Sequence, residues 1–152
     1  MGITIHFQGY LKDWNLLDDT IQITEEYAKS NGWKYTRSVK GITVIPSENC
    51  DPLNLEFDEN LHIDDFCKTQ FAGMDIHIKI LELLKKIRKN FNIMEIYDES
   101  EFLENGDKKL LKNKIAECFL VMEEYKRKNP NAHGPVKTPE GRMIDLENTK
   151  NK

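Results

Sequence analysis

The chain has 152 residues, 39% of them hydrophobic and 32% charged, and its 22 lysines and arginines face 26 aspartates and glutamates for a net charge of −4. This composition is typical of a soluble globular protein and excludes a collagen, a coiled-coil rod and a fully disordered chain. The longest apolar run, Cys118 to Met122, is much shorter than the roughly 20 residues of a membrane-spanning helix.

The first half of the chain alternates between strand and helix patterns. Apolar residues at every second position predict a strand over 3–8 that ends at Gly9. An apolar stripe from Trp14 to Ala28 predicts a helix, which stops at Asn31–Gly32 because glycine accepts the left-handed conformation there. Short strands around 33–37 and 42–45 follow.

The second half begins with the clearest strand pattern. Strict alternation over 53–57 leads through a tight turn at 59–60 into a strand that starts at Leu61 and runs towards Phe66. A helix with an apolar stripe over 76–91, a short strand at 93–96 and a helix with a stripe from Leu111 to Tyr125 come next. The predicted order is therefore β-α-β-β-β-β-α-β-α.

This order predicts an α+β fold. Consecutive strands with short links pair antiparallel most easily, so we expect a single curved antiparallel sheet of about five to six strands with three amphipathic helices on one face. Residues 1–128 are predicted to form one domain. Residues 129–152 contain three prolines, two glycines and few apolar side chains, which predicts a disordered polar tail.

The densest set of functional side chains lies between residues 62 and 77. A strand-to-helix connection in this region exposes amide groups that bind anions well. The residues predicted to contact a ligand are Asp64, Cys67, Lys68, Thr69, Gln70 and His77. We therefore expect a non-catalytic binding or interaction domain whose partner is a small anionic or polar ligand or another protein.

The same residues allow other interpretations. Cys67 precedes a helix, whose amide dipoles lower a thiol pKa, so a small enzyme that pairs Cys67 with His62 or His77 is the alternative function. A metal site of His62, Asp64, Cys67 and His77 has no recognised zinc spacing, and no metal is predicted. In the structural interpretation Cys67 fills the core and the loop caps the second helix.

No nucleotide, metalloprotease or serine-hydrolase motif is present, so no cofactor is predicted. The small acidic excess argues against nucleic-acid binding, which takes most of its affinity from basic side chains. The three cysteines Cys50, Cys67 and Cys118 are odd in number and far apart in sequence. Together with the lack of an export signal, this predicts reduced thiols and a cytoplasmic location without membrane contact.

Residues 66–72, 50–53 and 98–107 form three segments that resemble a family of small uncharacterised bacterial proteins with no established activity. The strongest is residues 66–72, Phe-Cys-Lys-Thr-Gln-Phe-Ala, which is similar to an F-C-K-T-Q-(aromatic)-A segment before a helix. Residues 50–53, Cys-Asp-Pro-Leu, and the acidic loop over 98–107 resemble two further segments of the family, although Leu103 stands where the family pattern has tryptophan. The resemblance covers residues 3–128 and implies a compact α+β domain, but no reaction.

Overall fold

The computed structural model describes residues 2–148. Its main strands are β1 (Thr4–Leu11), β2 (Lys34–Ser38), β3 (Gly41–Ile45), β4 (Leu53–Glu56), β5 (His62–Lys68) and β6 (Phe91–Asp98). Its helices are α1 (Asn15–Ser30), α2 (Met74–Ile87), the four-residue α3 (Phe102–Asn105) and α4 (Lys108–Lys128), and a single 3-10 turn, η1 (Arg88–Asn90), follows α2. Four two-residue strands end the described chain: β7 (Ala132–His133), β8 (Val136–Lys137), β9 (Met143–Ile144) and β10 (Glu147–Asn148).

The α+β class and the antiparallel pairing are confirmed, but the prediction of one sheet is wrong. The main strands form two three-stranded sheets, ordered β5-β1-β6 and β2-β3-β4, and the C-terminal strands pair as β10-β7 and β8-β9. The division falls between β4 and β5, which we expected to pair as neighbours along the chain. Near the end of β5 the amide of Lys68 donates to the Asp51 carboxylate, 3.0 Å away, so a side chain takes a bond that a strand carbonyl would otherwise accept.

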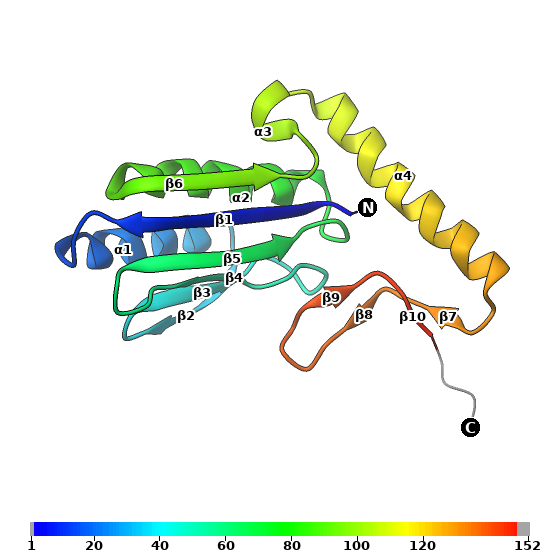
Figure 1. The fold of residues 1–152 in the computed structure, drawn as a ribbon, viewed down its shortest axis with the longest axis horizontal. Coiled ribbons are helices and arrows are strands. Elements are labelled where there is room, and N and C mark those ends of the chain that lie inside the picture. The colour runs from blue at the N-terminus through cyan, green and yellow to red at the C-terminus, as the bar shows by residue number, and fades with distance from the viewer. Residues whose placement is uncertain (1, 149–152) are drawn as a thin grey trace.

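The helices α1 and α2 lie side by side behind the β5-β1-β6 sheet, and the opposite face of that sheet is turned towards the viewer in Figure 1. Alternation along β1 explains this arrangement. Ile5, Phe7 and Leu11 are buried in the core together with the inner faces of both helices, whereas Gln8 and Tyr10 point to solvent. Burial of one face only is the usual state of an antiparallel sheet.

The sequence predicts that the first strand ends at Gly9. In the structure Gly9 instead lies within β1, which continues to Leu11. A Cβ atom at this position would meet the carbonyl oxygen of Ile93 at 2.4 Å. Glycine is therefore required here because the neighbouring strand β6 passes too close for a side chain. This glycine therefore reflects the close approach of two strand backbones and not the end of a strand.

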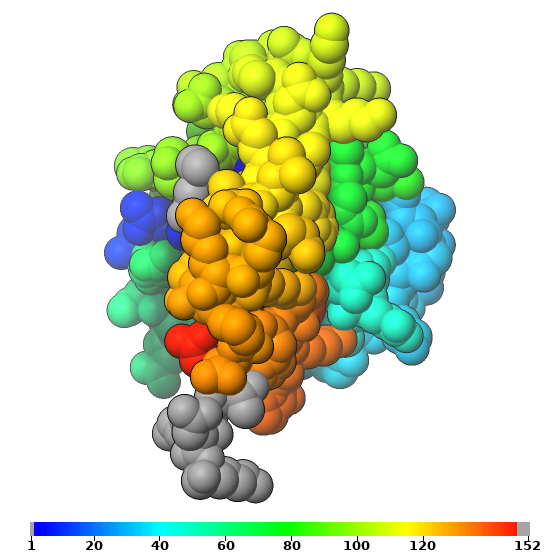
Figure 2. All heavy atoms as spheres, turned by 90° about the vertical axis from the view of Figure 1, so that its right-hand side faces the viewer, coloured from blue at the N-terminus to red at the C-terminus, as the bar shows by residue number. Residues whose placement is uncertain are grey.

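The apolar stripe of the last helix is buried only in part. Leu111, Cys118 and Met122 are buried, but Tyr125 at the far end is exposed. Figure 2 shows α4 crossing this side of the molecule and ending above the C-terminal strands. Trp14, at the start of α1, is 48% exposed, whereas Trp33 is buried.

Residues 132–148 differ from the disordered tail that the sequence predicts, because they form short strands that fold back onto the main body. Arg142 and the backbone of Met143 both bind the buried carboxylate of Asp51. The composition of this segment gave no sign of the contact, because Asp51 and Arg142 are far apart in the sequence. Residues 149–152 lie outside the described residues. In the described part of the chain, no helix is both long enough and apolar enough to cross a membrane.

Candidate functional site

The structure separates the residues that the sequence places in one ligand-binding loop. Cys67, Thr69, Gln70 and His77 are buried, Lys68 is half-buried, and Asp64 is exposed. The alternation of β5 is the reason, because Cys67 points inward from the strand while Asp64 points to the opposite face. Binding of a ligand by this loop stays a prediction, but most of its polar groups already have partners inside the protein.

His77, from α2, is the centre of a buried polar cluster. Its Nδ1 atom lies 2.6 Å from the hydroxyl of Thr69, and its Nε2 atom lies 3.1 Å from both the Ser100 hydroxyl and the Asp98 carboxylate. The Ser100 hydroxyl also donates to Asp98 over 2.7 Å. The Thr69 hydroxyl and the Asp98 carboxylate thus lie on opposite ring nitrogens, as the nucleophile and the acid of a catalytic triad do. Thr69 and Ser100 are both buried, however, so neither hydroxyl is exposed to a substrate in this structure.

Asp98 is held as a carboxylate by this cluster. Burial opposes its ionisation, but hydrogen bonds from His77 and Ser100 outweigh that effect and lower the pKa of Asp98 to about 2. The second carboxylate oxygen accepts the amide of Leu103. The side chain of Gln70 is also hydrogen-bonded inside the protein. Its amide oxygen accepts from the Ile3 backbone amide, and its amide nitrogen donates to the Met122 sulfur over 3.4 Å. These groups connect the loop to α4 and to the start of β1.

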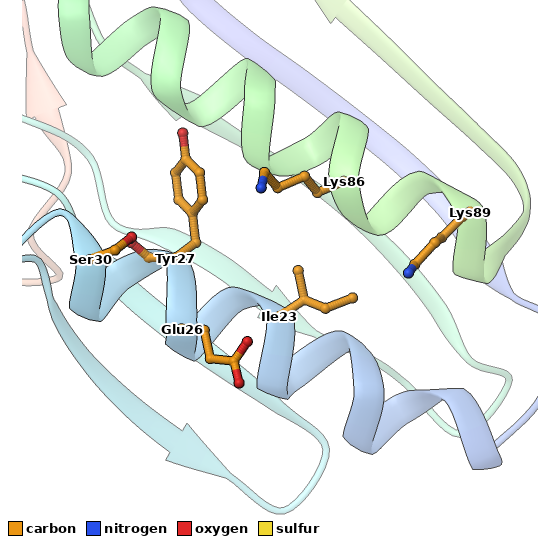
Figure 3. Close-up of a pocket in the computed structure, with 6 residues that line it drawn as sticks. All are labelled: Ile23, Glu26, Tyr27, Ser30, Lys86 and Lys89. Carbon is orange, nitrogen blue, oxygen red and sulfur yellow. The ribbon is translucent and has the colours of Figure 1, made fainter.

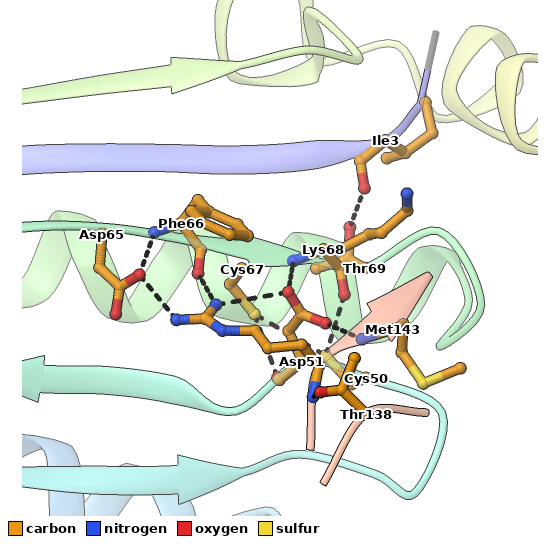
Figure 4. A network of polar contacts seen from close by, with 11 residues as sticks. Ile3, Cys50, Asp51, Asp65, Phe66, Cys67, Lys68, Thr69, Thr138 and Met143 are labelled. Atoms are coloured by element: carbon orange, nitrogen blue, oxygen red, sulfur yellow. Dashed lines mark hydrogen bonds and ion pairs between the residues drawn. The ribbon is translucent and has the colours of Figure 1, made fainter. Parts of the chain in front are cut away.

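A second buried cluster surrounds Asp51, as Figure 4 shows. One carboxylate oxygen accepts the Met143 amide at 2.6 Å, and the other accepts the Lys68 amide and lies 3.4 Å from the Arg142 guanidinium. Arg142 also donates to Asp65 and to the carbonyl of Phe66. Lys68, which we expected to bind an anion, forms an ion pair with Asp145. Residues from the ranges 50–53, 66–72 and 98–107 thus meet in these two internal clusters.

The surroundings of Cys67 do not favour a catalytic nucleophile. Its side chain is fully buried, and its sulfur lies 3.9 Å from the Cys50 sulfur and 3.3 Å from the carbonyl oxygen of Asp51. The hydrogen-bonding contact with Cys50, followed by burial, raises the pKa of Cys67 well above its ordinary value. A reactive thiolate needs a lowered pKa and access to solvent, and Cys67 has neither.

We therefore expect Cys67 to resist alkylation in the folded protein. With iodoacetamide at pH 7.5, peptide mass spectrometry should find Cys67 unmodified after a time that fully modifies free cysteine, and modified once guanidinium chloride unfolds the chain. Cys118 is the internal comparison, because it is buried less completely and should react sooner. Rapid modification of Cys67 in the folded state would restore the enzyme hypothesis.

The exposed face of the β5-β1-β6 sheet carries a regular set of side chains that we call the open face. The strand registers align them in three rows of three, one residue from each strand. From one end to the other, these rows are His62, Tyr10 and Ile93; Asp64, Gln8 and Glu95; and Phe66, His6 and Tyr97. Successive rows lie roughly 7 Å apart, because alternate residues of a strand share a face.

The outer rows of the open face are mainly aromatic. The rings of Tyr10 and His62 are 4.5 Å apart between centroids, and His6 stacks on Tyr97 at 5.6 Å. Tyr97 is 62% exposed and Phe66 is 44% exposed. Exposed apolar side chains that gather on one face are a feature of many interaction surfaces.

The middle row of the open face is acidic. Asp64 has no ion pair or side-chain hydrogen bond to any residue between 2 and 148, and Glu95 accepts only a 3.4 Å hydrogen bond from Gln8. Neighbouring strands are about 4.8 Å apart, so the two carboxylate-bearing residues lie roughly 10 Å from each other. A shallow hollow of about 270 Å³ covers this row and reaches His6 and Tyr97.

A second hollow, of about 370 Å³, lies between α1 and α2 and is shown in Figure 3. Most of its polar groups have partners within the protein. The Ser30 hydroxyl donates to the Tyr27 carbonyl, the Tyr27 hydroxyl donates to Glu82, and the Lys86 ammonium lies 5.5 Å from the centre of the Tyr27 ring. We therefore regard the open face as the better candidate site.

Asp64 is the one residue of the predicted site that reaches the open face. The sequence did not indicate five other residues of the open face as site residues: His6, Gln8, Tyr10, Glu95 and Tyr97. The alternation in the first strand could have indicated this face, because its polar side carries the rings of His6 and Tyr10 and the amide of Gln8. Comparisons with family models, with curated proteins and with solved structures gave no match.

Proposed function

We propose that this protein is a non-catalytic binding domain and that its open face contacts the ligand. The observation that carries the proposal is the exposed combination of two aromatic rows with a row whose carboxylates have no cationic partner among residues 2–148. The core on the other side of the sheet is already complete without them.

The buried clusters support the same proposal by providing a rigid base. His77, Asp98 and Asp51 hold the ends of β5 and β6 and the loops beside them through hydrogen bonds inside the protein. Binding surfaces on rigid elements keep their side chains in place with little loss of entropy on binding. The interpretation as a Cys67 enzyme has no such support, because its sulfur has no access to solvent.

A nitrogen-15 NMR titration tests the proposed function. Small fragments and short peptides of positive, negative and zero charge are added to the labelled chain, and the shifted backbone amides are mapped onto the fold. We expect the largest shifts in β1, β5 and β6 at residues of the open face. The proposal fails if no probe causes shifts there, or if the shifts gather in the hollow between α1 and α2.

A further inference from the structure

We infer that the open face binds an arginine-bearing segment of another protein, with a guanidinium group held above Asp64, Gln8 and Glu95. This inference rests on the proposed function and specifies its partner. Asp64 and Glu95 supply two negative charges that the described residues leave unpaired, so a positive charge is the complementary ligand. The rings on both sides of this row favour a flat cation over a compact one, because a guanidinium can stack on them.

The protein already binds one of its own arginines in this manner at the edge of the open face. The Arg142 guanidinium lies 4.3 Å from the centre of the Phe66 ring and donates to the Asp65 carboxylate over 2.8 Å. Its partners are thus an exposed ring and a carboxylate on neighbouring residues of β5. Asp64 offers the same kind of carboxylate one residue further along the strand, and no cation of the described chain lies against it.

The other cations near the face do not neutralise the middle row. Lys68 is paired with Asp145, and Arg142 is shared between Asp51 and Asp65. His6 lies 3.2 Å from Glu99, which adds another carboxylate at the end of β6. The uncompensated charge of the open face is therefore negative, which also disfavours nucleic acid as the ligand.

The test uses a capped seven-residue peptide in which glycine alternates with arginine, and its affinity is measured by NMR titration of the full chain. The double variant Asp64→Asn/Glu95→Gln should bind it roughly tenfold more weakly, because two charge pairs at an exposed site are lost. Substitution Tyr97→Ser should weaken binding about threefold through loss of stacking. The matched control Glu59→Gln/Glu117→Gln removes the same total charge from exposed positions elsewhere and should bind as the wild type does.

Peptide analogues separate the inference from the proposed function. A citrulline peptide keeps the shape of arginine without its charge, and we expect it to bind roughly as weakly as the arginine peptide binds the double variant. If the citrulline or a glutamate peptide shifts the open face as strongly as the arginine peptide, the inference is wrong while the proposed function stands. If shifts at the face depend on protein concentration without peptide, the occupant is a second copy, which also overturns the inference. If no peptide of any charge shifts the face, both fail.

Discussion

Replacing Asp98 by asparagine should lower the free energy of unfolding at pH 7 by about 3 kcal/mol, because an amide group replaces one of two buried acceptor oxygens that face four donors. In the wild type, the Asp98 oxygens accept hydrogen bonds from Ser100 and from the Leu103 amide and lie against His77. The NH₂ group of asparagine would face one of these donors without an acceptor. Urea denaturation followed by circular dichroism measures the change.

The same variant has a defined dependence on pH. In the wild type the pKa of Asp98 is lowered from 3.8 to about 2, so its stabilising effect is complete above about pH 4 and is lost as the pH falls through 2. This effect is on the order of 2 kcal/mol. The difference between wild type and Asp98→Asn should therefore narrow between pH 4 and pH 2.

Asp64→Asn is the matched control for this measurement. Its carboxylate is exposed and has no partner among the described residues, so we expect a change within about 0.5 kcal/mol. An Asp98→Asn protein as stable as this control, or a difference from wild type that does not depend on pH, would show that the His77 cluster does not hold Asp98 as a carboxylate.

Replacing Asp51 by asparagine should cost about 3 kcal/mol and loosen the C-terminal strands, because its buried carboxylate joins them to the rest of the fold. Asparagine offers one acceptor where Asp51 offers two, so either the Lys68 amide or the Met143 amide loses its partner. Relative to the wild type, we expect hydrogen–deuterium exchange in Asp51→Asn to speed up more over residues 132–148 than over β1. Peptide mass spectrometry measures the exchange of both segments.

Asp65→Asn provides the comparison. Asp65 also binds Arg142, but it is partly exposed, and the loss should stay under about 1 kcal/mol. Unchanged exchange over residues 132–148 in Asp51→Asn would mean that the C-terminal strands are held by other contacts.

The helices and the main strands could be predicted from spacing alone, because local periodicity determines which face of an element is buried. The pairing of those strands could not. β5 pairs with β1, more than fifty positions earlier in the chain, and no local pattern distinguishes that partner from β4. The polar, proline-containing C-terminal segment was misleading for the same reason, since the buried partner of Arg142 is Asp51, far away in the sequence.

The candidate site shows a similar limit. Density of polar residues drew attention to residues 64–77, but density does not reveal whether a side chain already has a partner. His77 and Gln70 are fully engaged inside the protein, whereas Gln8 and Glu95 reach the surface on different strands. Only the register of three strands, two of them distant in sequence from the third, brings Asp64, Gln8 and Glu95 into one row.

The bond between Asp51 and Arg142 has a consequence for synthesis of the chain on the ribosome. The main strands and α1 leave the ribosome before residue 142 does, so sheets that assemble during synthesis do so with the Asp51 carboxylate still lacking its cation. Such a chain stays less stable at this corner until its last segment arrives. A frameshift or stop codon after α4 would therefore leave a protein with its main core intact and an uncovered charge that quality-control proteases could recognise.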